Sequence, residues 1–210
     1  MPKEITFALT SCGRPDLLME TLDSFVEQND YPIARYKIID DSAIPGINDA
    51  VMEKYLNIEW IHNTERLGQS KSIDILYDDI DTEYIFHCED DWKFLAPGFI
   101  EKSIELLESD RLLLQAWLRG YDDVNEHPLH EEKNGMRVVS YGYQGVWHGF
   151  SFNPGLRRLS DYMKVKPYSS LGWEKEINQF YMTMGMYAVV LPQRFVEHTG
   201  WGRHMQDAKG

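Results

Sequence analysis

The sequence predicts an α/β fold with a mostly parallel central sheet flanked by helices. Short apolar runs alternate with amphipathic stretches through residues 1–118, and this alternation is typical of successive β-α-β units. Polar or acidic residues follow each of the first four apolar runs. The chain of 210 residues fits one domain with a substantial core. We expect residues 1–118 to build the sheet and residues 119–210 to form a smaller, less regular region.

Each element of the first half follows from its hydrophobic pattern. Short apolar runs predict strands over residues 5–10, 36–39, 58–61, 83–88 and 112–117. Apolar side chains at helical spacing predict helices over residues 15–25, 47–55, 68–77 and 97–108. Pro15 suits the first turn of the first helix. Right-handed crossovers bring the carboxyl ends of parallel strands to one edge of the sheet, where ligands bind in such folds.

The second half has a less regular pattern. Residues 119–135 are polar and are expected to form a loop. Strands are predicted over residues 136–141, 145–152 and 186–191, and helices over residues 156–163 and 173–184. The tail, residues 196–210, is rich in glycine and histidine.

The composition argues against several classes of partner. Lys and Arg number 21 and Asp and Glu number 34, so the formal net charge is −13. Nucleic acids and anionic membrane surfaces require a cationic face, and we expect neither partner. Cys12 and Cys88 are too few for a disulfide framework and are expected to serve in packing. With no signal peptide and no run of about 18 apolar residues, we expect a soluble, cytoplasmic protein without a transmembrane segment.

Three consecutive acids, Glu89, Asp90 and Asp91, follow the apolar run that ends at Cys88. Like charges at the end of a buried strand repel one another unless a cation or hydrogen-bond donors compensate them. Mg²⁺ and Mn²⁺ prefer oxygen ligands and often bridge to phosphate groups. The cluster therefore indicates a site for a metal and a diphosphate, and the alternative is a solvated acidic loop.

Two more polar motifs fall at the same predicted edge. Asp40 and Asp41 end the second strand, where a carboxylate is suited to accept hydrogen bonds from a nucleobase or a ribose. The alternative is a turn in which the side chain binds its own backbone. Arg66 and Gly68 precede the third helix, and a helix N-terminus with a nearby guanidinium favours an anion. The alternative there is plain helix capping by Ser70.

The second half supplies candidates for a base and for further metal ligands. Glu174 and Glu176 flank Lys175 in the first turn of a predicted helix. Either carboxylate is a candidate to remove a proton from an acceptor hydroxyl, and the alternative is that both only favour the helix dipole. His198 and His204 in the tail are candidates to complete the coordination of a metal, although their spacing is not that of a zinc site.

Together these motifs resemble the family-2 glycosyltransferases, which have the Rossmann-like, nucleotide-sugar-binding GT-A fold. The resemblance covers roughly the first 110 residues. Glu89 stands where the family usually has the first Asp of its D-x-D metal motif, and Lys175 replaces the second member of the family's Glu-Asp pair. The matching segments are residues 5–25 with Thr10, Arg14 and Pro15, residues 38–42, Asn63 with residues 66–68, residues 89–91, and residues 97–99.

The resemblance implies an inverting transfer of a sugar from a nucleotide-diphosphate sugar to an acceptor hydroxyl, with Mn²⁺ or Mg²⁺ as cofactor. Residues 1–118 would bind the nucleotide sugar and residues 119–210 the carbohydrate or other acceptor. Glu174 or Glu176 would be the catalytic base. The metal ligands would come from Asp91, Glu89, His198 and His204. The donor would be held by Thr10, Arg14, Asp40, Asp41, Arg66, Glu89 and Asp90.

Two other functions remain open from the sequence. A nucleotidyltransferase on a related fold uses the same acids and metal, but it usually has a long, glycine-rich, basic loop after the first strand. Residues 11–15 are short and poor in glycine. A non-catalytic module that keeps the nucleotide pocket is the second alternative, and the departures at Glu89 and Lys175 leave it open.

Overall fold

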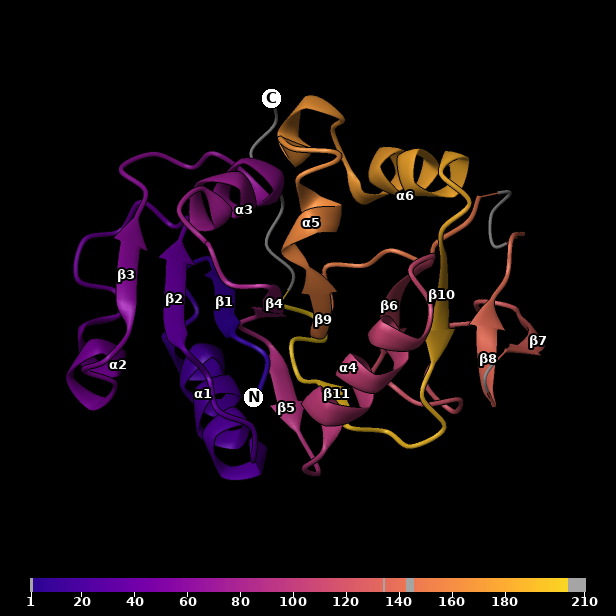
Figure 1. The fold of residues 1–210 in the computed structure, drawn as a ribbon. Helices are drawn as coiled ribbons and strands as arrows, with labels where there is room; N and C mark the ends of the chain where they lie inside the picture. Colours follow the sequence, from indigo (N-terminus) through magenta and orange to yellow (C-terminus); the bar gives the residue numbers. More distant parts are fainter. Residues whose placement is uncertain (1, 134, 143–145, 204–210) are drawn as a thin grey trace.

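The N-terminal half alternates strands and helices in the predicted order (Figure 1). The structure is a computed structural model and describes residues 2–133, 135–142 and 146–203. All five strands and four helices predicted for this half are confirmed to within a few residues, and β5 is additional. The elements are β1 (Ile5–Ser11), α1 (Pro15–Gln28), β2 (Arg35–Asp40), α2 (Asp49–Lys54), β3 (Glu59–His62), α3 (Gln69–Tyr77), β4 (Tyr84–Glu89), β5 (Trp92–Phe94), α4 (Phe99–Ser109) and β6 (Leu113–Trp117).

The central sheet has the order β3-β2-β1-β4-β9. Its first four strands are parallel, and β9 (Gly155–Arg158) is antiparallel to β4. The mostly parallel sheet is therefore confirmed. Since β1 lies between β2 and β4, the carboxyl ends of these three strands meet at one edge.

The last strand of the first half, β6, belongs to a second sheet of order β6-β10-β8-β7. It pairs in parallel with β10 (Tyr187–Val190), which is antiparallel to β8 (Met136–Val139). β7 (Leu129–Lys133) completes this sheet at the right of Figure 1. Because β9 occupies the open edge of β4, β6 pairs with a strand from the second half of the chain.

Several expectations for the second half were wrong. The predicted loop over residues 119–135 contains β7. The predicted helix over residues 156–163 begins as β9, and only α5 (Leu159–Tyr162) is helical, followed by the short helix η1 (Tyr168–Ser170). Of the predicted strand over residues 145–152, the described residues 146–152 form no strand, and the backbone groups of residues 149–152 bind side chains instead. The predicted helix over residues 173–184 is confirmed as α6 (Glu174–Thr183).

A three-residue strand, β11 (Val196–His198), lies in the tail and pairs with β5. This pair forms a separate two-stranded sheet. Elements of three residues are too short to produce a readable period in the sequence. The pairing nevertheless brings the tail to the carboxyl end of β4.

The alternation of β1 divides the core into two hydrophobic clusters on opposite faces of the sheet. Phe7 and Leu9 belong to the cluster that includes α1 and α4, and the rings of Phe7 and Phe25 lie 4.2 Å apart. Ala8 belongs to the cluster that includes α3, α5 and α6. By the same alternation Thr10, near the end of β1, faces α3. Helices therefore pack on both faces of the sheet, and the ends of its strands lie between these two layers.

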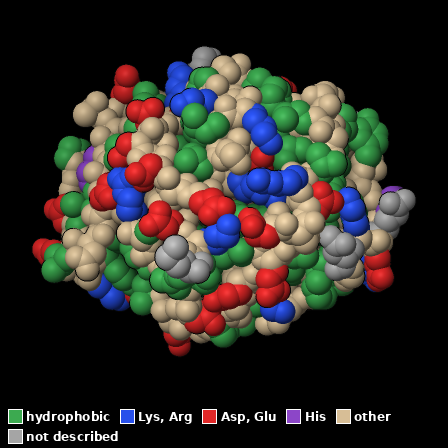
Figure 2. Space-filling view, viewed as in Figure 1, with side chains coloured by type: hydrophobic (Ala, Val, Ile, Leu, Met, Phe, Trp, Pro, Cys, Tyr) green, Lys and Arg blue, Asp and Glu red, His purple; other side chains and the backbone are tan. Residues whose placement is uncertain are grey.

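The surface carries charges of both signs. Figure 2 shows acidic and basic side chains lying next to one another on the face it presents. Arg35, for example, lies 2.8 Å from Glu59 and 3.0 Å from Asp79. Within residues 2–133, 135–142 and 146–203, no helix has the length and apolar character needed to cross a membrane.

A buried histidine in β4 gives the fold a testable pH dependence. The His87 side chain is fully buried, and its Nδ1 lies 2.8 Å from the Tyr77 hydroxyl. Burial, with a smaller effect of the nearby Arg157 charge, lowers the pKa of His87 well below 6.5. The folded protein therefore keeps His87 neutral, whereas the unfolded chain binds a proton as the pH falls below 6.5. The stability is present above this pH and is lost as the pH falls.

We expect the wild-type protein to lose about 1.4 kcal/mol of unfolding free energy relative to His87→Phe between pH 7.5 and pH 5.5. Urea unfolding of both proteins at the two pH values measures this difference, and groups common to both cancel. His62→Phe, at an exposed position, is the control. Its unfolding free energy should differ from that of the wild type by the same amount at both pH values. The prediction is wrong if the unfolding free energies of the wild type and His87→Phe differ by the same amount at pH 7.5 and at pH 5.5.

Candidate functional site

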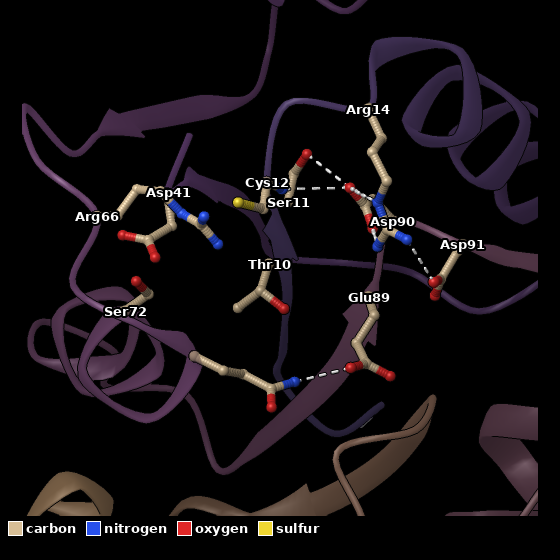
Figure 3. A pocket seen from close by; sticks show the side chains of 11 residues that line it. Thr10, Ser11, Cys12, Arg14, Asp41, Arg66, Ser72, Glu89, Asp90 and Asp91 are labelled. Atoms are coloured by element: carbon tan, nitrogen blue, oxygen red, sulfur yellow. Dashed lines mark hydrogen bonds and ion pairs between the residues drawn. The ribbon is translucent and has the colours of Figure 1, made fainter. Parts of the chain in front are cut away.

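A cavity of about 170 Å³ lies at the carboxyl ends of the parallel strands (Figure 3). In Figure 3, Thr10 lies between the group formed by Asp41, Arg66 and Ser72 and the group formed by Glu89 and Asp90. Most of the lining is polar or charged. The lining residues are Thr10, Ser11, Cys12, Arg14, Asp41, Arg66, Gln69, Ser72, Glu89, Asp90 and Asp91.

The turn after β1 is held by Asp40. The Asp40 carboxylate accepts hydrogen bonds from the N–H groups of Gly13 and Ser42, each at 3.0 Å, and from the Ser42 hydroxyl. Burial works to raise its pKa, but these bonds lower it. Gly13 is required in this turn, because its φ is +69° and a Cβ would lie 2.9 Å from the Ser42 Cβ. Asp40 thus shapes the rim and does not line the cavity.

Asp41 lines the cavity and fixes the approach to α3. Its carboxylate accepts the N–H groups of Leu67 and Gly68 at 2.8 Å and the Asn63 side-chain amide at 2.7 Å. These bonds hold the residues before α3 against the end of β2. Arg66 therefore lines the cavity.

Asp90 receives its counter-charge from within the chain. It is 1% exposed and forms an ion pair with Arg14, and it also accepts the Ser11 hydroxyl at 2.9 Å and the Cys12 N–H at 3.3 Å. Burial raises its pKa to about 6, and the Arg14 charge opposes the rise. The acid cluster is therefore compensated in part by a guanidinium, which the sequence alone did not indicate.

Asp91 lies between Arg14 and His198. Its Oδ2 is 2.9 Å from Arg14 Nη1 and 3.3 Å from His198 Nε2. Burial would raise the pKa of Asp91, but the contacts with His198 and Arg14 lower it. The pairing of β11 with β5 sets His198 opposite Trp92, and the two rings lie 5.0 Å apart. His204, the other predicted ligand, lies outside the described residues.

Glu89 is directed away from Asp90 and Asp91 (Figure 3). It accepts hydrogen bonds from the Gln69 side-chain amide at 2.7 Å and the Trp92 indole N–H at 3.2 Å. Burial, followed by the charges of Asp91 and Glu174, raises its pKa to about 8. At neutral pH Glu89 is therefore mostly protonated in this arrangement.

The two candidate bases have different surroundings. Glu174 is partly buried and accepts a hydrogen bond from the Phe152 N–H. Burial raises its pKa, and the Phe152 N–H opposes the rise. Glu176 is exposed, and its carboxylate accepts the Trp173 N–H at 3.2 Å. Glu176 thus caps α6 through the Trp173 N–H, whereas Glu174 is held inside the structure.

The start of α6 is tied to the start of α3. The Ser70 hydroxyl donates to the Gly172 carbonyl at 2.9 Å. Glu174 is close enough to the cavity for its charge to raise the pKa of Glu89. Glu174 is not among the lining residues, but its charge acts on Glu89, which lines the cavity.

Metal binding by this site would need donors from a ligand or from water. No group of three or more His, Cys, Asp or Glu among the described residues is arranged to hold a metal ion. Asp91 and His198 nevertheless present an oxygen and a nitrogen 3.3 Å apart. Mg²⁺ sites often use one or two carboxylates together with phosphate oxygens and water. The pair therefore fits a divalent cation that arrives with a diphosphate.

The sequence model of glycosyl transferase family 2 matches residues 6–166, which is more than half of the chain. The chain belongs to glycosyltransferase family 2. The match spans the whole cavity lining, and it ends before α6 and Glu174.

Solved structures with the GT-A fold resemble this family member closely in backbone. A mannosyltransferase of Pyrobaculum calidifontis, PcManGT, in complex with GDP-Man and Mn²⁺ has a TM-score of 0.73 at 17% identity, covering 97% of this chain and 59% of that chain. S. aureus TarS (residues 1–349) has a TM-score of 0.63 at 14% identity, covering 94% and 60%. GalNAc-T7 with UDP, GalNAc and Mn²⁺ has a TM-score of 0.66 at 12% identity, covering 94% and 44%.

The chain spans about three-fifths of the length of PcManGT and of the TarS fragment. No curated protein matches it in a sequence comparison. At these identities the structural likeness establishes the fold, and it leaves donor and acceptor open.

Some residues of the site were missed by sequence reasoning. Gln69, Ser72 and Cys12 line the cavity, and Trp92 binds Glu89. Gln69 follows Gly68 at a predicted helix start, and that position was a usable signal. Trp92 gave no signal, because its role depends on the pairing of β5 with β11.

Close packing of Gly200 against Asp91 gives a test of this arrangement. A Cβ on Gly200 would lie 2.3 Å from Asp91 Oδ2 and 2.8 Å from Asp91 Cβ. Rotation of the carboxylate relieves the first contact but not the second. We expect Gly200→Ala to lower the unfolding free energy by about 1–3 kcal/mol, measured by urea unfolding.

Gly202→Ala is the matched control in the same loop. It has no atom within 4 Å of an added Cβ, although its φ is +78°, so only a backbone cost of about 1 kcal/mol is expected. Equal stability of Gly200→Ala and the wild type would show that Asp91 is not packed as described.

Proposed function

We propose that this family-2 protein transfers a sugar from a nucleotide-diphosphate sugar to an acceptor hydroxyl with inversion at the anomeric carbon. The observation that supports this most is the cavity at the strand ends, which gathers Asp41, Arg66 and Asp91 and has Glu174 at its side. The structural relatives include complexes with GDP-Man and with UDP-GlcNAc. The family membership favours the transferase over the nucleotidyltransferase and binding-module alternatives.

The donor lies in the cavity with its nucleoside near Asp41 and its diphosphate near Arg66 and Asp91. The Asp41 side carries acceptors and small polar groups suited to a base or a ribose, including Thr10 and Ser72. Asp40 acts indirectly, because its carboxylate holds the turn that forms the rim. Arg14 neutralises Asp90 and limits the repulsion that the acids exert on a diphosphate.

Asp91 and His198 are the residues that would hold a divalent cation, Mn²⁺ or Mg²⁺. The contact between them is 3.3 Å, and both side chains are fixed, Asp91 by Arg14 and His198 by its ring contacts with Trp92 and Trp201. A bound cation neutralises charge that develops on a departing diphosphate.

Glu174 is the base. Its carboxylate takes the proton of the acceptor hydroxyl, and the hydroxyl oxygen forms a bond with the anomeric carbon. The bond between that carbon and the diphosphate oxygen breaks on the opposite face, and the electron pair leaves with the diphosphate. The Phe152 N–H and the rigid start of α6 orient the carboxylate for this step.

Glu174→Gln should lower turnover by about 10²–10⁴-fold, because the amide cannot accept the proton. Release of nucleoside diphosphate in the presence of Mn²⁺ and acceptor measures turnover, and calorimetry with GDP or UDP measures donor-site binding. Binding should remain within the error of the wild type.

Glu176→Gln is the matched control, since its carboxylate caps α6 and is exposed. It should keep most of the turnover and cost at most about 1 kcal/mol of stability. Normal turnover in Glu174→Gln, or its loss in Glu176→Gln alone, would reject Glu174 as the base.

Chelation of divalent cations with EDTA should abolish transfer, and added Mn²⁺ should restore it. His198→Gln should raise the Mn²⁺ concentration for half-maximal rate by at least about tenfold, or about 1.4 kcal/mol of binding free energy. His62→Gln is the control, because His62 is exposed at the end of β3. Full activity in EDTA would exclude the metal from the proposal.

A further inference from the structure

The segment Phe150–Phe152 is held by side chains and not by a neighbouring strand. Asn178 on α6 binds both the N–H and the carbonyl of Phe150 at 2.8 Å. Gln115 on β6 accepts the Ser151 N–H at 3.2 Å, and Arg157 on β9 donates to the Ser151 carbonyl at 3.1 Å. The Phe152 N–H then binds Glu174. The position of the Glu174 carboxylate therefore depends on how this segment is fixed.

Arg157 has an unusual environment for a guanidinium. Its side chain is 3% exposed and lies over the rings of Phe150 and Phe152, 5.1 and 5.9 Å from their centroids. Its Nε and Nη1 are buried without a hydrogen-bond partner among the described residues. None of the ion pairs within 4 Å found in the described part of the chain includes Arg157. A buried charge in this state is costly unless an anion lies near.

Five titratable groups lie close enough to Arg157 for its charge to act on their pKa values. They are Tyr77 on α3, His87 on β4, Tyr168 on η1, and Tyr181 and Glu174 on α6. Burial raises the pKa of each tyrosine and lowers that of His87, so these four groups are uncharged at neutral pH. Glu174 is the member of this set that can carry a negative charge there. Asp161 and Asp74 act on the same tyrosines, but Asp161 is paired with Arg158 and Lys164, and Asp74 accepts the Tyr168 N–H.

The charge of Arg157 in turn acts on the pKa of Glu174. Burial disfavours its ionised form, whereas the Phe152 N–H, the Arg157 charge and the Ser151 side chain favour it. Glu89 faces Glu174 from β4. Lys175 and Glu176, its neighbours on α6, are exposed. Arg157 is thus the cation that opposes burial at this carboxylate.

We propose that Arg157 is a positioning residue for Glu174: it fixes the Ser151–Phe152 peptide that binds the carboxylate, and its buried positive charge keeps this carboxylate ionised. The inference rests on the proposed function of Glu174 as the base. A protonated carboxyl cannot accept the acceptor's proton, so the charge of Arg157 acts on the rate without touching substrate.

The test is a titration that needs no substrate. In protein labelled with ¹³C at the glutamate carboxyl carbons, the Glu174 signal is assigned by its loss in Glu174→Gln. We expect Arg157→Met to raise the titration midpoint of this signal by about one pH unit, a tenfold change in its acid dissociation constant. Arg157→Lys should restore the midpoint to within a few tenths of a unit. Arg137→Met, at an exposed position on β8, is the control and should leave the midpoint unchanged.

The rate gives the second readout. The acid limb of the kcat profile of Arg157→Met should move to higher pH by the same amount, with binding of GDP or UDP unchanged. An unshifted Glu174 midpoint in folded Arg157→Met overturns the proposal. A shifted midpoint together with full activity of Glu174→Gln would leave the coupling of Arg157 to Glu174 in place and reject the base assignment instead.

If Arg157→Met folds poorly, the stability of a double variant tests the proposal instead. Removal of both charges in R157M/E174Q should recover stability relative to R157M, because neither buried charge is then left alone. Urea unfolding measures this recovery. A double variant that is no more stable than R157M overturns the proposal.

Discussion

The parallel pairing of β1 with both β2 and β4 is the constraint on which the site depends. It sets Asp40 and Asp90 on opposite sides of the turn that follows β1. Both carboxylates bind that turn, Asp40 through the Gly13 N–H and Asp90 through Ser11, Cys12 and Arg14. The turn is therefore held between two acids. The cavity lies beside this turn, at the carboxyl ends of the strands. The acids at these strand ends thus form part of the framework as well as the ligand surface.

Because some of these acids serve the framework and others face the cavity, they contribute unequally to the charge of the site. The sequence places acids at the ends of β2 and β4, and their repulsion predicts compensation by a cation or by hydrogen-bond donors. In the structure, main-chain N–H groups and Arg14 compensate Asp40, Asp41 and Asp90 within the protein. Asp91 contacts both Arg14 and His198, and it is the acid of this cluster whose charge an added cation would neutralise most. The formal charge of −13 therefore overstates the charge that a diphosphate meets.

The sequence was sufficient for the strand–helix alternation and for the gathering of Thr10, Asp41, Arg66 and the β4 acids at one edge, because these follow from local periodicity and parallel topology. It was not sufficient where side chains replace regular pairing. Residues 146–152 look like a strand because they are mostly apolar, but Asn178 binds the backbone of Phe150, and Gln115 and Arg157 bind that of Ser151. His198 was a candidate metal ligand from its place in the tail and from the resemblance, but its approach to Asp91 depends on β5 and β11, which are three residues each.

The replacement of the family's usual Asp by Glu89 is consistent with the place of Glu174. The longer side chain lets the Glu89 carboxyl reach Gln69 on α3 and the Trp92 indole, on the side of the cavity that faces α6. There, burial and the charges of Asp91 and Glu174 raise its pKa to about 8. A carboxyl that is neutral at pH 7 adds no negative charge beside the base, whereas Arg157 adds a positive one behind it. Arg157 therefore favours an ionised Glu174 in its partly buried position, and a neutral Glu89 does not oppose it.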